Sequence, residues 1–181
     1  MTDVFFEELV TELRLGTSKK GHPFRYMTMA TTDEEGDPRL RTVVLRRVTE
    51  DLKLFLYTDQ RSTKVTHIKK NKRASLLFYH PKKLLQLKVD ASARCITDED
   101  TLKRYWSGVP LASRKDYTTV SPPGSPISSP DALSYSEGLD NFCILELHPT
   151  KIEYLKLKRP NHIRVDYTRE GNDWKGQFLV P

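Results

Sequence analysis

The chain has 181 residues, 37% of them hydrophobic and 30% charged, and it carries a formal net charge of +6 at pH 7. This length suits one well-buried core, so we expect a single domain over residues 1–181. No apolar run approaches the roughly 20 residues of a membrane-spanning helix, so membrane insertion is not expected. The excess of Lys and Arg favours an anionic partner but does not identify one.

The first predicted element is a helix over residues 3–14, in which apolar side chains recur at helical spacing. Gly16 and the turn at residues 21–23 end this helix. From Arg25 the hydrophobic period changes to two, which is the pattern of strands separated by turns. The predicted strands cover residues 25–31, 39–48, 52–58, 74–79, 84–96, 142–147 and 152–157.

Helices are expected to interrupt this series of strands. Ser62 is positioned to cap a short helix that reaches Lys70, and residues 97–100 have the composition of a second helix start. A further short helix is expected after Pro110. Six or more short antiparallel strands with inserted helices indicate a mainly β protein, built as a closed or partly closed β-barrel.

Residues 121–137 form a segment of different composition. The segment contains four prolines and six serines among few apolar residues. Such a composition cannot pack by itself, so it predicts a flexible Ser/Pro-rich loop or lid.

Cysteine usage and the N-terminus bear on the cellular compartment. Cys95 and Cys143 are far apart in the sequence, and each lies in an apolar stretch, which is typical of reduced core thiols and not of a disulfide framework or zinc site. Residues 1–8 contain no basic leader followed by an apolar block, so export is not expected. These features predict a cytoplasmic protein without a structural metal.

Cationic and hydroxyl side chains converge where the predicted strands end. Alternation places Arg41 and Arg46 on opposite faces of one strand, and neither can be buried without a partner. The next strand ends at Tyr57-Thr58, and Ser62 and Lys64 follow at a helix N-terminus, which favours negative charge. Because the Arg fork suits phosphate, these residues predict a phosphate cradle. Salt bridges at the strand ends, with an ordinary Ser cap, are the alternative.

Other residues give weaker signals. The five histidines are scattered, which is typical of turn or surface positions, and the common catalytic motifs of hydrolases, zinc proteases and dinucleotide-binding proteins are absent. Tyr105-Trp106 on a predicted helix favours core packing over a cofactor contact. Phe55, Phe78 and Tyr79 lie in apolar runs and are expected in the core, which disfavours binding of single-stranded nucleic acid through exposed aromatic side chains.

Five segments, in their order along the chain, resemble the pyridoxamine 5′-phosphate oxidase family of FMN-binding split barrels, an antiparallel Greek-key type of barrel. The segments are Arg41-Thr-Val-Val-Leu-Arg46, Phe55-Leu-Tyr-Thr58, Ser62-Thr-Lys64, Ala74-Ser-Leu-Leu-Phe78 and Gln86-Leu-Lys-Val89. The resemblance covers residues 25–115, and Ile152-Glu-Tyr154 continues it more weakly.

This resemblance implies a homodimer with FMN at the subunit interface. It implies that Arg41 and Lys64 hold the FMN phosphate together with the hydroxyl groups of Thr58 and Ser62. The other cofactor contacts that it implies are Thr42, Val43 and Val44 beside the ring, Arg46 at its polar edge, Tyr57 at the ribityl chain, Thr63 where the family has an arginine, and Gln86 from across the dimer.

The substrate residues match the family only in part. Tyr105 and Ser113 match positions that bind the substrate phosphate in the oxidases. Val109 stands where the oxidases have an arginine, and the neighbouring Arg114 is the candidate to replace it. Arg164 corresponds to an arginine of a C-terminal family segment whose other residues differ. The resemblance therefore implies a retained flavin site and an altered substrate site.

Two functions of different class remain open. The first is an FMN-dependent oxidoreductase that acts on a small anionic substrate, such as a phosphorylated amine, with no side chain assigned as an acid or base. The second is a non-catalytic barrel that holds a flavin or docks a polyanion such as nucleic acid on its basic face. The residues themselves predict only an anion at Arg41, Thr58, Ser62 and Lys64, and the flavin rests on the resemblance.

Overall fold

The structure is a computed structural model that describes residues 1–181. Its strands are β1 (Tyr26–Thr32), β2 (Pro38–Val44), β3 (Arg47–Val48), β4 (Leu54–Asp59), β5 (Arg73–His80), β6 (Leu85–Ile96), β7 (Phe142–Lys156), β8 (Ile163–Glu170) and β9 (Asp173–Leu179). Its helices are α1 (Asp3–Ser18), α2 (Thr63–Lys70), α3 (Glu99–Ser107) and α4 (Leu111–Arg114), with short 3₁₀ turns at Pro23–Arg25, Lys115–Tyr117 and Pro130–Ala132. The predicted mainly β protein with inserted helices is confirmed.

All nine strands belong to one antiparallel sheet, whose main path runs β2-β1-β5-β6-β7-β4-β3. The sheet must curl, because its two edge strands, β2 and β3, are separated by only Leu45 and Arg46. The amide of Leu45 donates to Arg25 O at 2.9 Å, and the amide of Arg46 donates to Phe55 O at 2.9 Å. The barrel is therefore partly closed at this crossing, and the single strand predicted for residues 39–48 is wrong.

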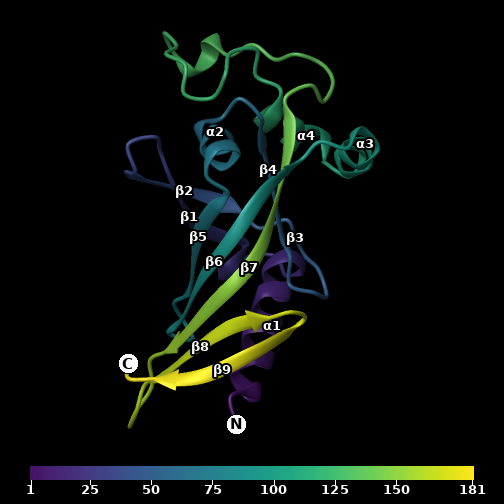
Figure 1. Ribbon diagram of the computed structural model, residues 1–181. Helices are drawn as coiled ribbons and strands as arrows, with labels where there is room; N and C mark the ends of the chain where they lie inside the picture. Colours follow the sequence, from purple (N-terminus) through teal and green to yellow (C-terminus); the bar gives the residue numbers. More distant parts are fainter.

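The helix α1 covers one end of the curled sheet (Figure 1). It extends to Ser18, beyond the expected residues 3–14, and its apolar stripe buries Leu9 and Leu13 completely in the main core. The hairpin β8–β9 lies beside α1, near both chain termini, whereas the segment of residues 118–140 lies at the opposite end of the molecule (Figure 1). Different elements therefore lie at the two ends of the sheet.

A second core lies on the outer side of β4 and β7. It consists of Phe55, Trp106, Val109, Tyr117, Phe142 and Ile144. Because α3 and the turns after it cover this side, β4 and the first half of β7 are buried on both faces, which explains their continuous apolar runs. β7 is one strand of 15 residues. The two separate strands predicted for residues 142–147 and 152–157 are therefore wrong.

Several side chains lie in other surroundings than the sequence predicted. His22 and His80 are buried, not in exposed turns, and Tyr79 is 49% exposed although Phe55 and Phe78 are buried as predicted. The error for Tyr79 arises because the alternation of a strand shows that two faces differ, but it does not show what covers each face. The errors for His22 and His80 arise because a turn-like sequence does not show which element covers the turn, and here Glu12 of α1 lies against both rings.

The two cysteines lie side by side, although they are far apart in the sequence. Cys95 on β6 pairs with Leu145 on β7, and Cys143 precedes Leu145 by two residues on the same face of β7. Both thiols are free, and both line one small cavity of about 170 Å³. Cys143 is buried, as predicted for a core thiol, whereas Cys95 is only partly buried.

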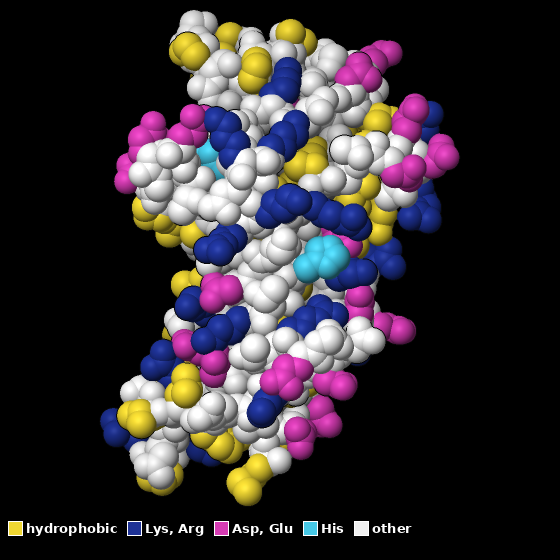
Figure 2. Space-filling model, in the orientation of Figure 1, with side chains coloured by type: hydrophobic (Ala, Val, Ile, Leu, Met, Phe, Trp, Pro, Cys, Tyr) yellow, Lys and Arg dark blue, Asp and Glu magenta, His cyan; other side chains and the backbone are white.

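The basic side chains are dispersed on the face seen in Figure 2. Lys and Arg spread across this face with Asp and Glu between them, so the net charge of +6 is not gathered in one patch there. None of the helices combines the length and apolarity required to cross a lipid bilayer.

Candidate functional site

A pocket of about 380 Å³ lies where β2, β4 and α2 meet. Its walls are formed by Arg41, Thr42, Val43, Val44, Leu56, Tyr57, Thr58, Asp59, Lys64, Asp116, Tyr117, Pro123 and Leu145. The strand β2, the end of β4 and the first turn of α2 thus bring the predicted cations and hydroxyl groups to one place. Arg41, Thr58 and Lys64 line the pocket together, as predicted, whereas Ser62 and Arg46 contact lining residues without lining it themselves.

Arg41 and Lys64 are partly buried cations whose hydrogen-bond partners are neutral. Arg41 Nη1 donates to Thr31 Oγ1 at 2.8 Å and to Met29 O at 3.3 Å. Lys64 Nζ donates to Thr58 Oγ1 at 2.9 Å. Burial lowers the pKa of both side chains, and the charge of Arg41 lowers the pKa of Lys64 further. Two cations that are desolvated and lack a hydrogen-bonded carboxylate favour a bound anion.

The N-terminus of α2 contributes backbone amides to the same place. Ser62 occupies the N-cap position, but its hydroxyl donates to Asp59 O at 2.7 Å and accepts no capping hydrogen bond. The predicted Ser62 side-chain cap is therefore wrong. Since the side chain does not satisfy the first amides of α2, these amides and the helix dipole are directed at the end of the helix where Lys64 lies. Thr63, the first residue of α2, is exposed and does not line the pocket.

Arg46 adjoins the pocket through two tyrosines. Its Nη2 donates to the Tyr117 hydroxyl group at 3.0 Å, and its guanidinium lies 5.5 Å from the centre of the Tyr57 ring. Burial raises the pKa of both tyrosines above the ordinary value. The Nε atom of Arg46 is buried and has no hydrogen-bond partner. Arg46 therefore offers an unused donor at the edge of the pocket.

Three of the predicted substrate residues lie on or beside α3 and α4. The Tyr105 ring is 6.1 Å from the Tyr57 ring, and the Tyr105 hydroxyl group accepts a hydrogen bond from Arg47 Nη1 at 2.6 Å. Ser113 lies on α4. The guanidinium of Arg114 donates to Val109 O at 3.1 Å and to Trp106 O at 3.3 Å, and it stacks on the Trp106 ring at 4.9 Å. Arg114 is thus engaged within its own helical region.

Gln86 and Arg164 lie in a different part of the molecule. Gln86 pairs with Leu155, and Leu155 pairs with Arg164, so the three residues form one row across β6, β7 and β8. Thr58 pairs with Cys143 at the other end of β7, roughly 40 Å away along the strand at about 3.3 Å per residue. One chain therefore cannot bring Gln86 or Arg164 to the pocket.

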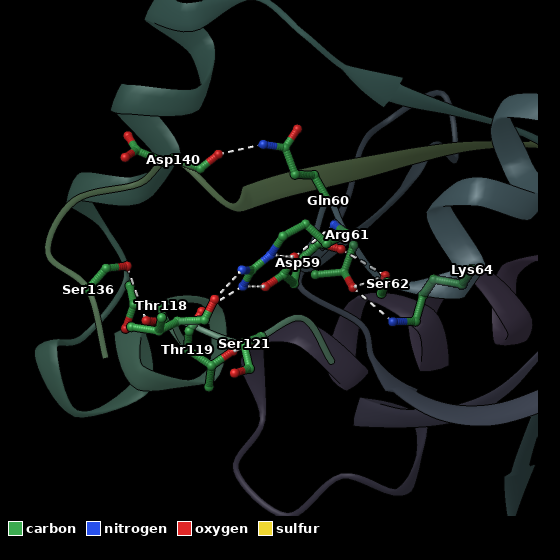
Figure 3. A network of polar contacts seen from close by, with 12 residues as sticks. Asp59, Gln60, Arg61, Ser62, Lys64, Thr118, Thr119, Ser121, Ser136 and Asp140 are labelled. Atoms are coloured by element: carbon green, nitrogen blue, oxygen red, sulfur yellow. Dashed lines mark hydrogen bonds and ion pairs between the residues drawn. The ribbon is translucent and has the colours of Figure 1, made fainter. Parts of the chain in front are cut away.

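Two residues that the sequence did not indicate, Asp59 and Arg61, connect the pocket to the chain just before the Ser/Pro-rich segment (Figure 3). Arg61 pairs with Asp59 and also donates to the backbone oxygens of Thr119 and Val120. The only local signal is an Asp-x-Arg spacing at a turn, and that spacing does not indicate a contact with a segment far along the chain.

Comparisons with known proteins agree with this architecture. Residues 6–97 match the family described as "Pyridoxamine 5′-phosphate oxidase, FMN-binding domain". The chain is 30% identical to the pyridoxine/pyridoxamine 5′-phosphate oxidase of Legionella pneumophila (strain Paris), over 86% of this chain and 77% of that protein. It is 31% identical to pyridoxine/pyridoxamine 5′-phosphate oxidase 2 of Arabidopsis thaliana, over 74% of each chain.

Two solved structures share the fold. A pyridoxamine 5′-phosphate oxidase-related, FMN binding protein from Nostoc punctiforme matches with a TM-score of 0.82 and 26% identity, over 97% of this chain and 96% of that one. PhzG from Burkholderia lata, in complex with tetrahydrophenazine-1-carboxylic acid, matches with a TM-score of 0.78 over 99% of this chain and 91% of that one. Its identity of 19% supports the fold alone. The matched segment, the named relatives and the shared fold show that the chain belongs to the pyridoxamine 5′-phosphate oxidase-like family of FMN-binding split barrels.

Proposed function

We propose that this protein is an FMN-dependent oxidoreductase that works as a homodimer on a small anionic substrate. The observation that carries the proposal is the pair Arg41 and Lys64, two partly buried cations whose hydrogen-bond partners are all neutral. The phosphate group of FMN is a dianion near neutral pH and would supply the missing negative charge.

The residues around the pocket fit the rest of the cofactor. Arg41 and Lys64 would hold the phosphate with the hydroxyl groups of Thr58 and Ser62, and Thr63 would add its backbone amide at the start of α2. Arg46 would donate through its unused Nε to a polar edge of the ring system. The other contacts would come from Thr42, Val43, Val44 and Tyr57, which line the pocket. Bound FMN would supply the redox chemistry, by accepting a hydride from a C–N or C–H bond of the substrate.

The substrate would be anionic, and a phosphorylated amine is the first class to test. Relatives at about the 30% identity level carry the name pyridoxine/pyridoxamine 5′-phosphate oxidase, which supports this class. Tyr105 and Ser113 would contact the anionic group of the substrate near the Tyr57 side of the pocket. Arg114 would act mainly through its charge, because its guanidinium already donates to two backbone oxygens. Since Arg114 would replace the family arginine only through its charge, the substrate preference would depart from that of the named oxidases.

A second copy of the chain would complete the site. Tyr79, Gln86, Leu155 and Arg164 form one row across four strands. Tyr79 is 49% exposed and the nearby Leu77 is 41% exposed, so this face offers apolar area for a partner. Since Gln86 and Arg164 cannot reach the pocket of their own chain, they would serve the pocket of the other copy. Light scattering of the purified protein should then give the mass of a dimer.

A flavin titration tests the cofactor assignment. The wild-type protein should bind FMN much more tightly than riboflavin, which lacks the phosphate group. Arg41→Met should reduce the FMN affinity by roughly 30-fold or more, because it removes a charge-assisted contact, and riboflavin affinity should change little. Arg39→Met is the matched control, since Arg39 is on the same strand and pairs with Asp33 at 2.6 Å. Equal affinity of the wild type for the two flavins would contradict the assignment.

A turnover screen tests the enzymatic assignment. The FMN-loaded protein would be mixed with pyridoxamine 5′-phosphate, pyridoxine 5′-phosphate, other phosphorylated amines and their unphosphorylated forms. Oxygen consumption or reduction of an artificial electron acceptor should occur only with the phosphorylated compounds. Tight FMN binding without turnover of any of them would favour the alternative, a non-catalytic flavin-binding barrel.

A further inference from the structure

Asp59 places a buried carboxylate in the wall of the pocket that contains Arg41 and Lys64. Its side chain is only 2% exposed, it lines the pocket, and its negative charge acts on Lys64. An unpaired carboxylate at this position would repel an incoming anion and would compete with it for the Lys64 ammonium group. The pocket can attract an anion only if this charge is neutralised locally.

Arg61 neutralises the charge of the Asp59 carboxylate through a bidentate contact. Arg61 Nε donates to Asp59 Oδ1 at 3.0 Å, and Arg61 Nη2 donates to Asp59 Oδ2 at 2.6 Å. The backbone amide of Arg61 also donates to Asp59 Oδ1, at 2.8 Å. Both carboxylate oxygens are therefore occupied from the side of the β4–α2 turn, and Lys64 remains free of an ion pair with Asp59.

The same guanidinium holds the chain just before the Ser/Pro-rich segment (Figure 3). Arg61 Nη1 donates to Val120 O at 2.8 Å, and Arg61 Nη2 donates to Thr119 O at 2.6 Å. The adjacent Gln60 holds the chain just after this segment, because its Nε2 donates to Asp140 O at 2.6 Å. Between these two attachments the chain presents Pro123 to the pocket wall.

We propose that Arg61 is a positioning residue that couples the two halves of the site: it keeps the Asp59 carboxylate away from Lys64, and it fixes residues 118–140 as a wall of the pocket. This inference rests on the proposed function, since the anion in question is the phosphate group of the flavin. Arg61 itself does not contact that anion, because its donors are directed at Asp59 and at two backbone oxygens. It therefore does not replace the family arginine that is Thr63 in this chain.

Two readouts separate the two roles of Arg61. The first is the ratio of FMN affinity to riboflavin affinity, which reports the phosphate contact. The second is the rate at which chymotrypsin cleaves the flavin-free protein after Leu133 or Tyr135, which are 39% and 43% exposed and lie within the held segment. Arg61→Met should lower the affinity ratio roughly 10- to 100-fold, because it leaves a buried carboxylate unpaired. It should also accelerate the cleavage.

The double variant Asp59→Asn/Arg61→Met removes the carboxylate charge together with the guanidinium. The affinity ratio should return close to the wild-type value, whereas cleavage should remain fast because the segment is still unattached. Arg61→Lys keeps a charge beside Asp59 but cannot reach all four acceptors, so it should retain the ratio and still be cleaved faster than the wild type. Arg39→Met, which also removes one surface charge, should change neither readout.

Each unexpected result has a distinct meaning. An unchanged ratio in Arg61→Met, or a ratio that stays low in the double variant, overturns the neutralising role. Unchanged cleavage in both Arg61→Met and Arg61→Lys overturns the attachment of the segment. If the wild-type protein itself fails to prefer FMN over riboflavin, the proposed function fails, and the cleavage rates still decide whether Arg61 positions the segment.

Discussion

Glu12 and His22 form a buried contact between α1 and the turn before β1, with Glu12 Oε2 3.1 Å from His22 Nε2. His80 Nε2 lies 3.8 Å from the same carboxylate oxygen, and Lys83 Nζ lies 2.5 Å from Glu12 Oε1. The backbone amides of Phe24 and Lys83 donate to Nδ1 of His22 and His80. Since each Nδ1 is an acceptor, each neutral ring carries its proton on Nε2 and directs it toward Glu12.

The tautomers also decide what this cluster can do. Glu12, His22 and His80 are close enough together to suggest metal ligands. A metal bound at Nε2 would require the proton to be on Nδ1, where a backbone N–H group already points at the ring. The cluster is therefore a hydrogen-bonded clasp that holds α1 against the barrel.

Acid should weaken this clasp. Burial lowers the pKa of His22 below the ordinary 6.5, the charges of His80 and Lys19 act in the same direction, and Glu12 opposes them. The folded state therefore prefers neutral His22, so its contribution to stability is fully present above pH 6.5 and is lost as the pH falls below that value. Thermal unfolding measured across this range should show a falling midpoint in the wild type.

His22→Asn tests the assignment of this acid sensitivity. Asn keeps an acceptor for the Phe24 amide but does not titrate, so the midpoint should fall less steeply with acid than in the wild type. Parallel pH profiles of the two proteins would show that other groups cause the acid sensitivity.

The sequence predicted those elements whose local pattern matches their final surroundings. The helix α2 was predictable because Val65 and Ile68 fall on one face, and both are buried. The break between β2 and β3 was not predictable, because the alternating pattern continues through Leu45 and Arg46 although the chain crosses there from one edge of the sheet to the other. A local period cannot report which strands become neighbours.

The contacts of the candidate site also fall into those that the sequence could predict and those that it could not. The convergence of Arg41, Thr58 and Lys64 was predictable because they lie close together in the sequence, on β2, β4 and α2, with only the short strand β3 between the first two. The contact between Arg61 and Thr119 was not, because it spans 58 residues and ends on a backbone oxygen, which carries no sequence signal. The contacts that attach the pocket wall could therefore be found only in the structure, whereas the cations of the pocket could be predicted from the sequence.

Gly16 should resist replacement although it lies in a helix. A Cβ atom at this position would lie 2.9 Å from the backbone oxygen of Phe24. Ala normally stabilises a helix by about 1 kcal/mol relative to Gly, but overpacking costs about 1–3 kcal/mol, so we expect Gly16→Ala to destabilise the protein by up to about 2 kcal/mol. Urea unfolding measures this change. Ser18→Ala, at an exposed position of the same helix, should have little effect, and a stabilised Gly16→Ala would contradict the close approach of α1 to Phe24.

FMN affinity should fall at alkaline pH. Burial and the charge of Arg41 lower the pKa of Lys64 below 10.5, so Lys64 loses its proton at a lower pH than an ordinary lysine. A bound phosphate favours the charged form, so affinity must decrease as the pH rises through the lowered pKa. Titrations from neutral pH to 10.5 should show this decrease for FMN and not for riboflavin. Lys64→Arg should remove the pH dependence, because the guanidinium stays charged throughout this range.

Cys95 should be the reactive thiol of this protein. The pKa of Cys95 is lowered to about 7: hydrogen bonding with Cys143 is the largest cause, burial opposes it, and the charge of Lys69 makes a smaller contribution in the lowering direction. The pKa of Cys143 is raised by the same hydrogen bond and by burial. Cys95 is also the more accessible of the two. At neutral pH, iodoacetamide should therefore label one thiol rapidly, and peptide mass spectrometry should identify it as Cys95.

The neighbouring thiol should control this reactivity. Cys143→Ala removes the hydrogen bond that is the largest cause of the lowered pKa, so labelling of Cys95 should slow by several-fold, up to about tenfold, as the thiolate fraction falls. Lys69→Met should slow it less, because the Lys69 charge is the smallest of the three influences. Cys95→Ser should abolish rapid labelling while the slow reaction of Cys143 remains. Equal rates at the two cysteines, or an unchanged rate in Cys143→Ala, would mean that exposure alone determines the reaction and that the pairing of the thiols across β6 and β7 has no chemical effect.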